Sequence, residues 1–264
     1  MTMNPKPSEH LLHALHAHQQ QHRFISDQAI CDIASRLNLP RAQVEAVTEF
    51  YSLFHRNPRG RFDILFSNCT SCGAIPLMNK LCEKLQVKAG ATRADGLISI
   101  AETSCIGMCD HGASALVNSL TVTSLSEAMI EEMASLIEAE TPVSEWPNSW
   151  FQIGNNIRKE GLLLSDSFEP GAALKAIAGR SSDEILDEIT ASGLKGRGGA
   201  GFATGLKWKF CRDAASDQSY VVCNADEGEP GTFKDRVLLT THAHQLVEGM
   251  TICAAIIGAC QGFI

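Results

Sequence analysis

The sequence has no apolar run that approaches the roughly 20 residues needed for a membrane-spanning helix. Its first ten residues, MTMNPKPSEH, contain no apolar signal core. An excess of basic residues is also missing, because the net charge is −8 and basic side chains are scattered outside one glycine-rich segment. A nucleic-acid-binding surface is therefore not expected. These absences predict a soluble, cytoplasmic protein with no direct membrane insertion and no nucleic-acid partner.

The 264 residues are enough for two ordinary domains, and a composition of 44% apolar and 20% charged residues is that of a globular protein. Ten cysteines need an explanation, because a cytoplasmic chain of this size is not expected to be held by disulfides. Four of them form two close pairs, Cys69 with Cys72 and Cys105 with Cys109. The other six lie mostly in apolar surroundings, where a free cysteine behaves as a small hydrophobic residue.

Residues 8–57 are predicted to form three helices, the first capped by Ser8 and the second by Ser26 or Asp27. The third, RAQVEAVTEFYSLF, places apolar side chains on one face: Val44, Val47, Phe50, Tyr51 and Phe54. The next residues predict the order strand, helix, strand, hairpin and helix, at 61–67, 75–87, 97–101, 115–122 and 125–137. This order, over about 80 residues, predicts a small α/β sandwich of the thioredoxin type.

The second half of the chain predicts further α/β structure. A helix over 183–193 begins after Ser181 or Ser182 and ends at Gly193. It is followed by a helix, a short strand and an apolar helix, at 208–214, 220–224 and 244–259. The last residues, 262–264, read as the start of a buried strand, so we expect the sequence to be part of a longer one. The expected regions are a helical N-terminal region, a thioredoxin-like domain, a linker and a partial α/β domain, at 1–58, 59–140, 141–178 and 179–264.

The two cysteine pairs indicate a metal centre. A [2Fe–2S] cluster needs four thiolates, two for each iron, from loops that approach from two sides. Each pair follows a predicted strand, and nearby glycines would let the backbone approach the sulfurs. A structural zinc would use the same four thiolates, although a zinc ribbon usually has two C-x2-C pairs. A thiol redox pair at Cys69 and Cys72 would leave Cys105 and Cys109 unexplained. In the remaining alternative, all four cysteines are structural residues of the core and bind no metal.

The segment from Gly193 to Lys209, GLKGRGGAGFATGLKWK, indicates a nucleotide site. Four of its glycines fall within six residues, and such a run can turn several backbone N–H groups towards one anion. The basic residues beside it suit a phosphate, and the later segment 224–236, NADEGEPGTFKDR, suits the hydroxyl or amine groups of a nucleotide. The loop also matches the Rossmann pattern G-x-G-x-x-G, but it follows a predicted helix rather than a strand. Together the two segments predict a flavin or nicotinamide nucleotide site.

The first half resembles the thioredoxin-like [2Fe–2S] subunit of respiratory NADH dehydrogenases. The residues that carry this resemblance are CIGMCDHGASALVNSLTVTSL from Cys105 onwards, and VTEFYSLF before an N-P-R-G turn. The resemblance implies a [2Fe–2S] cluster whose ligands are the four paired cysteines, Cys69, Cys72, Cys105 and Cys109.

One departure from that family concerns the first cysteine pair, which is usually C-x4-C. If Cys72 aligns with the second member, Ser67 stands where the first cysteine would be. Cys69 would then substitute through a tighter loop. Cys82 is a second candidate, because its x12 spacing from Cys69 matches free thioredoxin-like ferredoxins. Since some fused relatives have lost their cluster cysteines, an empty site is a further alternative.

Residues 180–264 resemble the flavin-binding subunit of the same enzymes, through GRGGAGFATGLKW and NADEGEPGTFKDR. This resemblance implies an FMN site shared with NAD(H), in which hydride transfer needs no catalytic side chain. The loop would wrap the phosphate or ribityl chain of FMN, Lys207 would add positive charge, and Phe202 and Phe210 would flank the nicotinamide nucleotide. The cofactor-binding residues implied are Gly196, Arg197, Gly198, Gly199, Ala200, Gly201, Phe202, Lys207, Phe210, Asn224, Asp226, Glu227, Gly228 and Glu229.

The fusion of both parts in one chain is similar to the diaphorase subunits of cytoplasmic NAD-reducing hydrogenases. This resemblance implies an electron-transferring subunit of a multisubunit redox complex, with an iron–sulfur relay subunit and a hydrogenase or formate dehydrogenase module as partners. A respiratory NADH–quinone oxidoreductase subunit is an alternative, and a non-catalytic assembly module with degenerate cofactor sites is another. A [4Fe–4S] cluster is expected only in a C-terminal part that this sequence does not include, so the chain alone is expected to be inactive.

Overall fold

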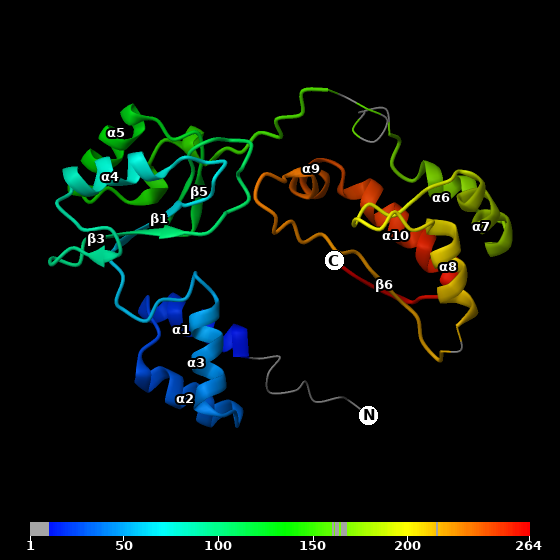
Figure 1. The fold of residues 1–264 in the computed structure, drawn as a ribbon, viewed down its shortest axis with the longest axis horizontal. Coiled ribbons are helices and arrows are strands. Elements are labelled where there is room, and N and C mark those ends of the chain that lie inside the picture. The colour runs from blue at the N-terminus through cyan, green and yellow to red at the C-terminus, as the bar shows by residue number, and fades with distance from the viewer. Residues whose placement is uncertain (1–10, 160, 162–163, 165–167, 215) are drawn as a thin grey trace. The chain divides into compact units, whose positions relative to one another are not determined.

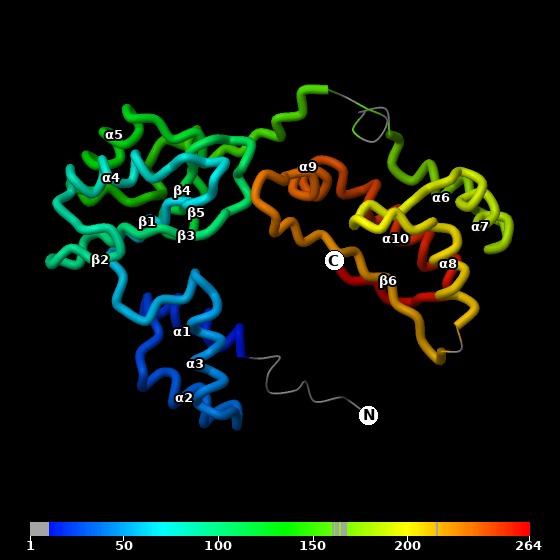
Figure 2. Tube along the Cα trace, in the orientation of Figure 1, coloured from blue at the N-terminus to red at the C-terminus, as the bar shows by residue number. Residues whose placement is uncertain are grey.

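The computed structural model describes residues 11–264 except 160, 162, 163, 165–167 and 215 (Figures 1 and 2). The chain divides into two compact units. The first contains the described residues up to Gly154, together with Gly228–Thr232, and the second contains Asn155–Glu227 and Phe233–Ile264. Within the described part of the chain, no helix combines the length and the apolar character that crossing a membrane requires.

The first unit begins with three helices, α1 (Leu11–His22), α2 (Asp27–Leu37) and α3 (Arg41–Phe50). Ser26 caps α2 by accepting a hydrogen bond from the N–H of Ala29, at 3.1 Å. The predicted cap at Ser8 lies outside the described residues. The helices share a core of apolar side chains: Leu11, Leu15, Ile25, Ala29, Ile30, Ile33, Ala34, Val44 and Phe54.

The predicted apolar face of the third helix is wrong at its C-terminal end. The helix ends at Phe50, and the backbone of Tyr51 is already extended. The helical spacing therefore does not extend to Tyr51, whereas Phe50 is still helical. The Phe50 side chain is 79% exposed and that of Tyr51 is 43% exposed, whereas Val44 and Phe54 are buried as expected.

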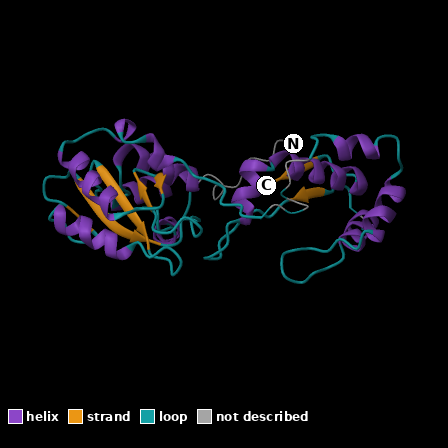
Figure 3. Ribbon diagram, turned by 90° about the horizontal axis from the view of Figure 1, so that it is seen from above, coloured by secondary structure: helices purple, strands orange, loops and turns teal. Residues whose placement is uncertain are grey.

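A five-stranded sheet has the order β2-β3-β1-β4-β5, in which β1 and β3 are parallel and the other neighbours are antiparallel. Figure 3 shows the strands in orange and the helices in purple. The strands are β1 (Phe62–Ser67), β2 (Ala91–Thr92), β3 (Ile98–Thr103), β4 (Ala115–Val117) and β5 (Leu120–Val122). Helices α4 (Ile75–Lys84) and α5 (Glu127–Glu138) pack on this sheet in one apolar core. The predicted order of strand, helix, strand, hairpin and helix is confirmed, and only the two-residue β2 was not predicted.

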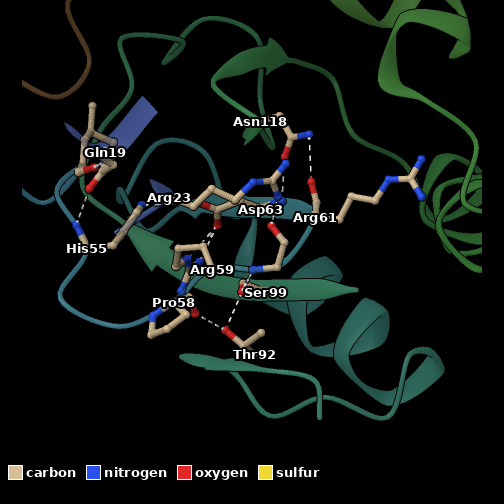
Figure 4. Close-up of polar contacts among 12 residues, drawn as sticks. Gln19, Arg23, His55, Pro58, Arg59, Arg61, Asp63, Thr92, Ser99 and Asn118 are labelled. Carbon is tan, nitrogen blue, oxygen red and sulfur yellow. Dashed lines mark hydrogen bonds and ion pairs between the residues drawn. The ribbon is translucent and has the colours of Figure 1, made fainter. Parts of the chain in front are cut away.

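Polar contacts tie the N-terminal helices to this sheet (Figure 4). The carboxylate of Asp63, on β1, accepts a hydrogen bond from Arg59 Nε at 2.9 Å and lies 3.3 Å from Nε2 of His55. The backbone N–H of His55 donates in turn to Oε1 of Gln19 on α1, at 2.7 Å. Burial alone would raise the pKa of Asp63, but His55 and Arg59 outweigh it and hold that pKa below its ordinary value.

Gly60 lies at the closest approach between the connecting segment and the sheet. Its N–H donates to Oγ of Ser99 at 2.7 Å, and its carbonyl oxygen accepts from Nη1 of Arg23. A Cβ atom at this position would lie 2.7 Å from the backbone carbon of Ile98, which is closer than real Cβ contacts. Only glycine therefore fits here.

Two tryptophans of the predicted linker 141–178 belong to the first unit. After the short 3-10 segments η2 (Val143–Glu145) and η3 (Asn148–Phe151), Trp146 and Trp150 are buried in the core of the sheet. The Trp146 ring stacks on Phe62, with centroids 5.9 Å apart. The compact unit therefore extends past the predicted boundary at residue 140, to Gly154.

The second unit has helices α6 (Ala172–Ile177), α7 (Ser182–Ala191), α8 (Thr204–Asp213), α9 (Lys234–Thr241) and α10 (Ala243–Ile257). Ser181 and Glu184 form a capping box at α7. Strands β6 (Tyr220–Val222) and β7 (Gln261–Phe263) pair in parallel. The strand predicted at 262–264 is present, but the expectation that it is buried is wrong, because all of β7 is exposed.

Glu248, on α10, caps the start of α6. Its side chain is buried, and its carboxylate accepts hydrogen bonds from the N–H groups of Gly171 at 3.0 Å and Leu174 at 2.9 Å. Burial would raise the pKa of this group, but the backbone donors outweigh it and lower the pKa. A charged group thus holds a helix of six residues against α10.

We expect Glu248→Gln to expose residues 171–177 to faster hydrogen exchange at pH 7, on the order of tenfold, because two charge-assisted hydrogen bonds are weakened. The folded-state pKa is lowered, so the stabilisation is complete above the ordinary value of 4.5 and disappears as the pH falls through the folded-state pKa. The difference between wild type and variant should vanish at low pH. Glu169→Gln is the control, because it removes a carboxylate that makes, among the described residues, only an exposed ion pair with Lys175 of α6; equal exchange in both variants would contradict this role.

Candidate functional site

The two predicted cysteine pairs converge at one edge of the sheet. Strands β1 and β3 are parallel and in register, with Ser67 opposite Thr103, and each strand ends two residues before its first cysteine. The Sγ atoms of Cys69, Cys105 and Cys109 all lie within 4.8 Å of one another, so among the described residues these three side chains are close enough to hold a metal ion together.

The fourth cysteine completes this group from the first loop. The Sγ atom of Cys72 lies 2.8 Å from that of Cys69, and the Sγ atoms of Cys105 and Cys109 are 3.2 Å apart. The backbone N–H of Gly107 also donates to the Cys105 sulfur, at 3.4 Å. Two thiols from each of two loops are what the two irons of a [2Fe–2S] cluster require, so the residues present fit this cofactor.

The thiols differ in how readily they ionise. Burial raises the pKa of Cys69, but interactions with Cys72, with Ser67 and with the backbone bring it down to about 7. Burial is the main reason why the pKa of Cys72 is raised to about 12, and its interaction with Cys69 raises it further. Burial likewise raises the pKa of Cys105 to about 11. Since the thiolate is the form that binds metal, Cys69 is the first available ligand at neutral pH.

Cys82, the alternative ligand, lies elsewhere. It is on α4, its side chain is buried in the apolar core of the sheet, and burial raises the pKa of its thiol. Unlike Cys72, which contacts the Cys69 sulfur, Cys82 belongs neither to the group of three sulfurs nor to either close sulfur pair. The structure therefore favours the four paired cysteines as ligands.

The predicted glycine loop is closed by the chain itself. Lys195 and Ala203 form an antiparallel bridge, and the N–H of Gly196 donates to the carbonyl oxygen of Phe202 at 2.8 Å. A further hydrogen bond of 2.9 Å runs from the N–H of Thr204 to the carbonyl oxygen of Leu194. All residues from 196 to 202 are exposed at the tip, which directly precedes α8.

The glycines of this segment have different roles. Gly199 and Gly201 have φ angles of 117° and 62°, which favour glycine for conformational reasons. Gly198 has neither a positive φ nor any atom within 4 Å of a Cβ built on it, so the space beside it is open. Gly205, in contrast, packs α8 on α7, because a Cβ there would lie 2.2 Å from Oγ1 and 3.0 Å from Cα of Thr190. The open space at Gly198 fits the close approach of a ligand to the backbone.

The start of α8 adds positive charge and aromatic surface to the loop. Its first turn has no acidic residue and no side-chain cap, and it contains Lys207, which is exposed like Arg197 in the loop. These features suit an anion near the helix N-terminus. The rings of Phe202 and Phe210 lie 6.4 Å apart and are 48% and 59% exposed, so they can stack on the rings of a ligand.

The predicted acidic segment is partly used by the fold. Asn224 Oδ1 accepts a hydrogen bond from the N–H of Asp226 at 3.1 Å, which closes a local turn. Oε2 of Glu227 accepts from the N–H groups of Asp235 and Arg236, at 2.9 and 3.2 Å, and so caps α9. This cap was missed at the sequence level, where the segment was interpreted as a binding loop only.

The other predicted residues of this segment, Asp226, Gly228 and Glu229, are exposed, as is Ala200 in the glycine loop. The carbonyl oxygen of Glu229 accepts a hydrogen bond from Oγ1 of Thr232 at 2.6 Å. The glycine loop and the acidic segment are thus each held in shape by their own local hydrogen bonds.

The sequence was compared with known protein families. Residues 1–138 match the sequence model of the thioredoxin-like [2Fe-2S] ferredoxin family. The chain belongs to that family. Residues 189–264 match the Nuo51 FMN-binding domain, so a thioredoxin-like [2Fe–2S] domain is followed by an FMN-binding domain in one α/β chain, as predicted.

Relatives of the whole chain and of its second half are both known. The NAD-reducing hydrogenase HoxS subunit alpha of Cupriavidus necator is 31% identical over 93% of this chain and 43% of its own length. An NADH-quinone oxidoreductase subunit of Escherichia coli is 53% identical over 35% of this chain and 21% of its own length. A crystal structure of NAD+-reducing [NiFe]-hydrogenase in the air-oxidized state matches 99% of this chain and 46% of that chain, with a TM-score of 0.84 and 36% identity. The chain thus spans less than half the length of these relatives.

Proposed function

We propose that this chain is the electron-transferring diaphorase part of an NAD-linked oxidoreductase, which passes electrons between NAD(H), FMN and iron–sulfur clusters. The convergence of the cysteine sulfurs within 4.8 Å, in a chain that also contains an FMN-binding domain, carries this proposal. FMN, when bound, accepts a hydride and releases its electrons singly, and a [2Fe–2S] cluster takes one electron at a time. The chain's task is to hold the two cofactors and to position the nicotinamide.

In this proposal the residues divide by cofactor. Cys69, Cys72, Cys105 and Cys109 hold the [2Fe–2S] cluster. The backbone of residues 196–201 and the Lys207 ammonium bind FMN, and Phe202 and Phe210 orient the nicotinamide nucleotide. The exposed polar groups of Asn224, Asp226, Gly228 and Glu229, with the second carboxylate oxygen of Glu227, bind the hydroxyl groups of FMN and NAD(H).

The partners in this proposal are the remaining subunits of a hydrogenase-type complex in the cytoplasm. The HoxS relative, which covers both units, supports this choice over the NADH-quinone oxidoreductase relatives, such as the Escherichia coli one, which matches about a third of the chain. Nickel in the complex purified with the tagged, natural gene product is the expected result, and molybdenum instead would contradict it.

The cofactor assignment is tested by anaerobic reconstitution of the natural gene product with FMN, iron and sulfide. We expect bound flavin and, after reduction, the EPR signal of one [2Fe–2S] cluster per chain. A folded protein that stays colourless would refute the proposal and favour a docking module with degenerate sites.

The proposed contact between FMN and the backbone at Gly198 is tested by two glycine substitutions, one expected to change FMN affinity and the other to change stability. Gly198→Ala should weaken FMN binding by about tenfold or more, ~1.4 kcal/mol, because its methyl group occupies the ligand's space. Its thermal unfolding should match wild type, since no atom lies within 4 Å of the new Cβ. Gly205→Ala should instead lower the unfolding midpoint, with partial rescue by Thr190→Ala. Fluorescence titration of FMN and calorimetry check both, and unchanged FMN affinity in Gly198→Ala would exclude the contact.

A further inference from the structure

The hydroxyl of Ser67 is a buried polar group that the fold does not use. Ser67 is the last residue of β1, its side chain is fully buried, and its Oγ makes no hydrogen bond of ordinary geometry among the described residues. Its backbone is satisfied, because its N–H donates to the carbonyl oxygen of Ser114 at 3.0 Å. A buried hydroxyl without a partner costs folding free energy, so a structural role does not account for it.

The position of Ser67 relates this hydroxyl to the cysteine group. It is two residues before Cys69 at the end of a strand that leads straight into the first cysteine loop. Its hydroxyl interacts with the thiols of both Cys69 and Cys72. The sulfurs are therefore the acceptors within its reach, and they are weak acceptors until they carry the negative charge of metal-bound thiolates.

We propose that the Ser67 hydroxyl donates a hydrogen bond to a cysteine sulfur of the [2Fe–2S] cluster, on the Cys69–Cys72 side, and raises the cluster's reduction potential. Reduction adds one electron to the cluster and increases the negative charge on its sulfurs, so a donor at this place stabilises the reduced form more than the oxidised one. Ser67 is a positioning residue, because its hydroxyl acts through a ligand sulfur and not on iron. This inference rests on the cluster assignment proposed above.

The matched control is another buried serine of the same unit. Ser114 is also fully buried, but its Oγ already donates to the carbonyl oxygen of Gly112 at 3.0 Å. Ser114→Ala removes the same atom as Ser67→Ala, but that atom bonds a carbonyl group instead of a sulfur. A general effect of serine removal on the protein would appear in both variants.

The test compares the reconstituted 264-residue wild type with Ser67→Ala and Ser114→Ala. Redox titration followed by EPR should give one cluster per chain in all three, with a more negative midpoint potential in Ser67→Ala than in the other two. The unfolding midpoint of the cluster-free Ser67→Ala protein should equal or exceed that of wild type, because the variant no longer buries an unpaired hydroxyl. Resonance Raman spectra of wild type in H2O and D2O should show a shift of the iron–cysteine stretching bands that is smaller in Ser67→Ala.

Three outcomes would overturn the inference. An unchanged potential in Ser67→Ala would show that the hydroxyl makes no bond to the cluster. Loss of the cluster from a folded Ser67→Ala protein would make Ser67 an iron ligand instead. If that variant does not fold, proton ENDOR of the wild-type cluster decides, and the absence of any exchangeable proton beyond those of backbone amides would refute the bond. A wild type without a cluster would refute the proposed function itself.

Discussion

Cys105→Ser is expected to leave the reconstituted chain without its [2Fe–2S] cluster. Cys105 is one of three residues whose sulfurs lie within 4.8 Å of one another, and each iron needs two thiolates. A serine hydroxyl at this place is not ionised at neutral pH and is a poor iron ligand. Iron and sulfide content, and the EPR signal after reduction, should fall below about a tenth of the wild-type values.

Cys82→Ser is the matched control for this loss. The substitution is the same, but the Cys82 side chain lies in the apolar core and not among the converging sulfurs. We expect a lower unfolding midpoint, because a hydroxyl replaces a buried thiol in apolar surroundings, and an unchanged EPR signal per folded chain. Retention of the cluster in Cys105→Ser together with its loss in Cys82→Ser would reverse the ligand assignment.

Gly60→Ala is expected to destabilise the first unit by about 3 kcal/mol, because the added methyl group meets backbone rather than a movable side chain. The new Cβ would lie 2.7 to 2.8 Å from three backbone atoms of Ile98. Relief requires the connecting segment to move away from β3, which also weakens the hydrogen bond to Ser99. This loss of stability is among the largest that we expect from the addition of a single methyl group.

Unfolding of the two units can be followed separately by tryptophan fluorescence, because each unit contains tryptophan. Trp146 and Trp150 lie in the core of the first unit, and Trp208 packs in the second. In a Trp208→Phe background, denaturant unfolding followed by fluorescence reports the first unit. Gly154→Ala is the control, since a Cβ there meets nothing closer than 4.0 Å. Equal midpoints for the two variants would show that the approach at Gly60 is not tight.

Most helices and strands and the cysteine positions were predictable because each depends on a local pattern, whereas α6 and α9 were not predicted. The strand residues before Cys69 and Cys105, the hairpin turn at Asn118 and Ser119, and the cap at Ser181 are read from neighbouring residues alone. The structure confirms these elements, and both turn residues have the left-handed φ angles, 47° and 70°, that this kind of hairpin needs.

What the sequence did not reveal depends on contacts between distant residues. Gly205 lies in a glycine-rich motif and was grouped with it, but its packing partner is Thr190 on another helix. The cap that Glu227 provides is meaningful only once α9 exists. Trp146 and Trp150 were interpreted as a linker surface because their burial against Phe62 depends on the folded sheet. Orientation and burial at such positions are tertiary properties that no local pattern encodes.

Because Lys195 and Ala203 form a bridge, the flavin loop loses its conformational entropy at a particular step. Hydrogen bonds within the chain close the loop, so its conformational entropy is lost on folding and not when a nucleotide arrives. A chain that has lost its flavin is therefore expected to keep the shape of the loop and to take up a new molecule without refolding. Flavin release on dilution would be a reversible exchange, and the chain itself would not need to be replaced.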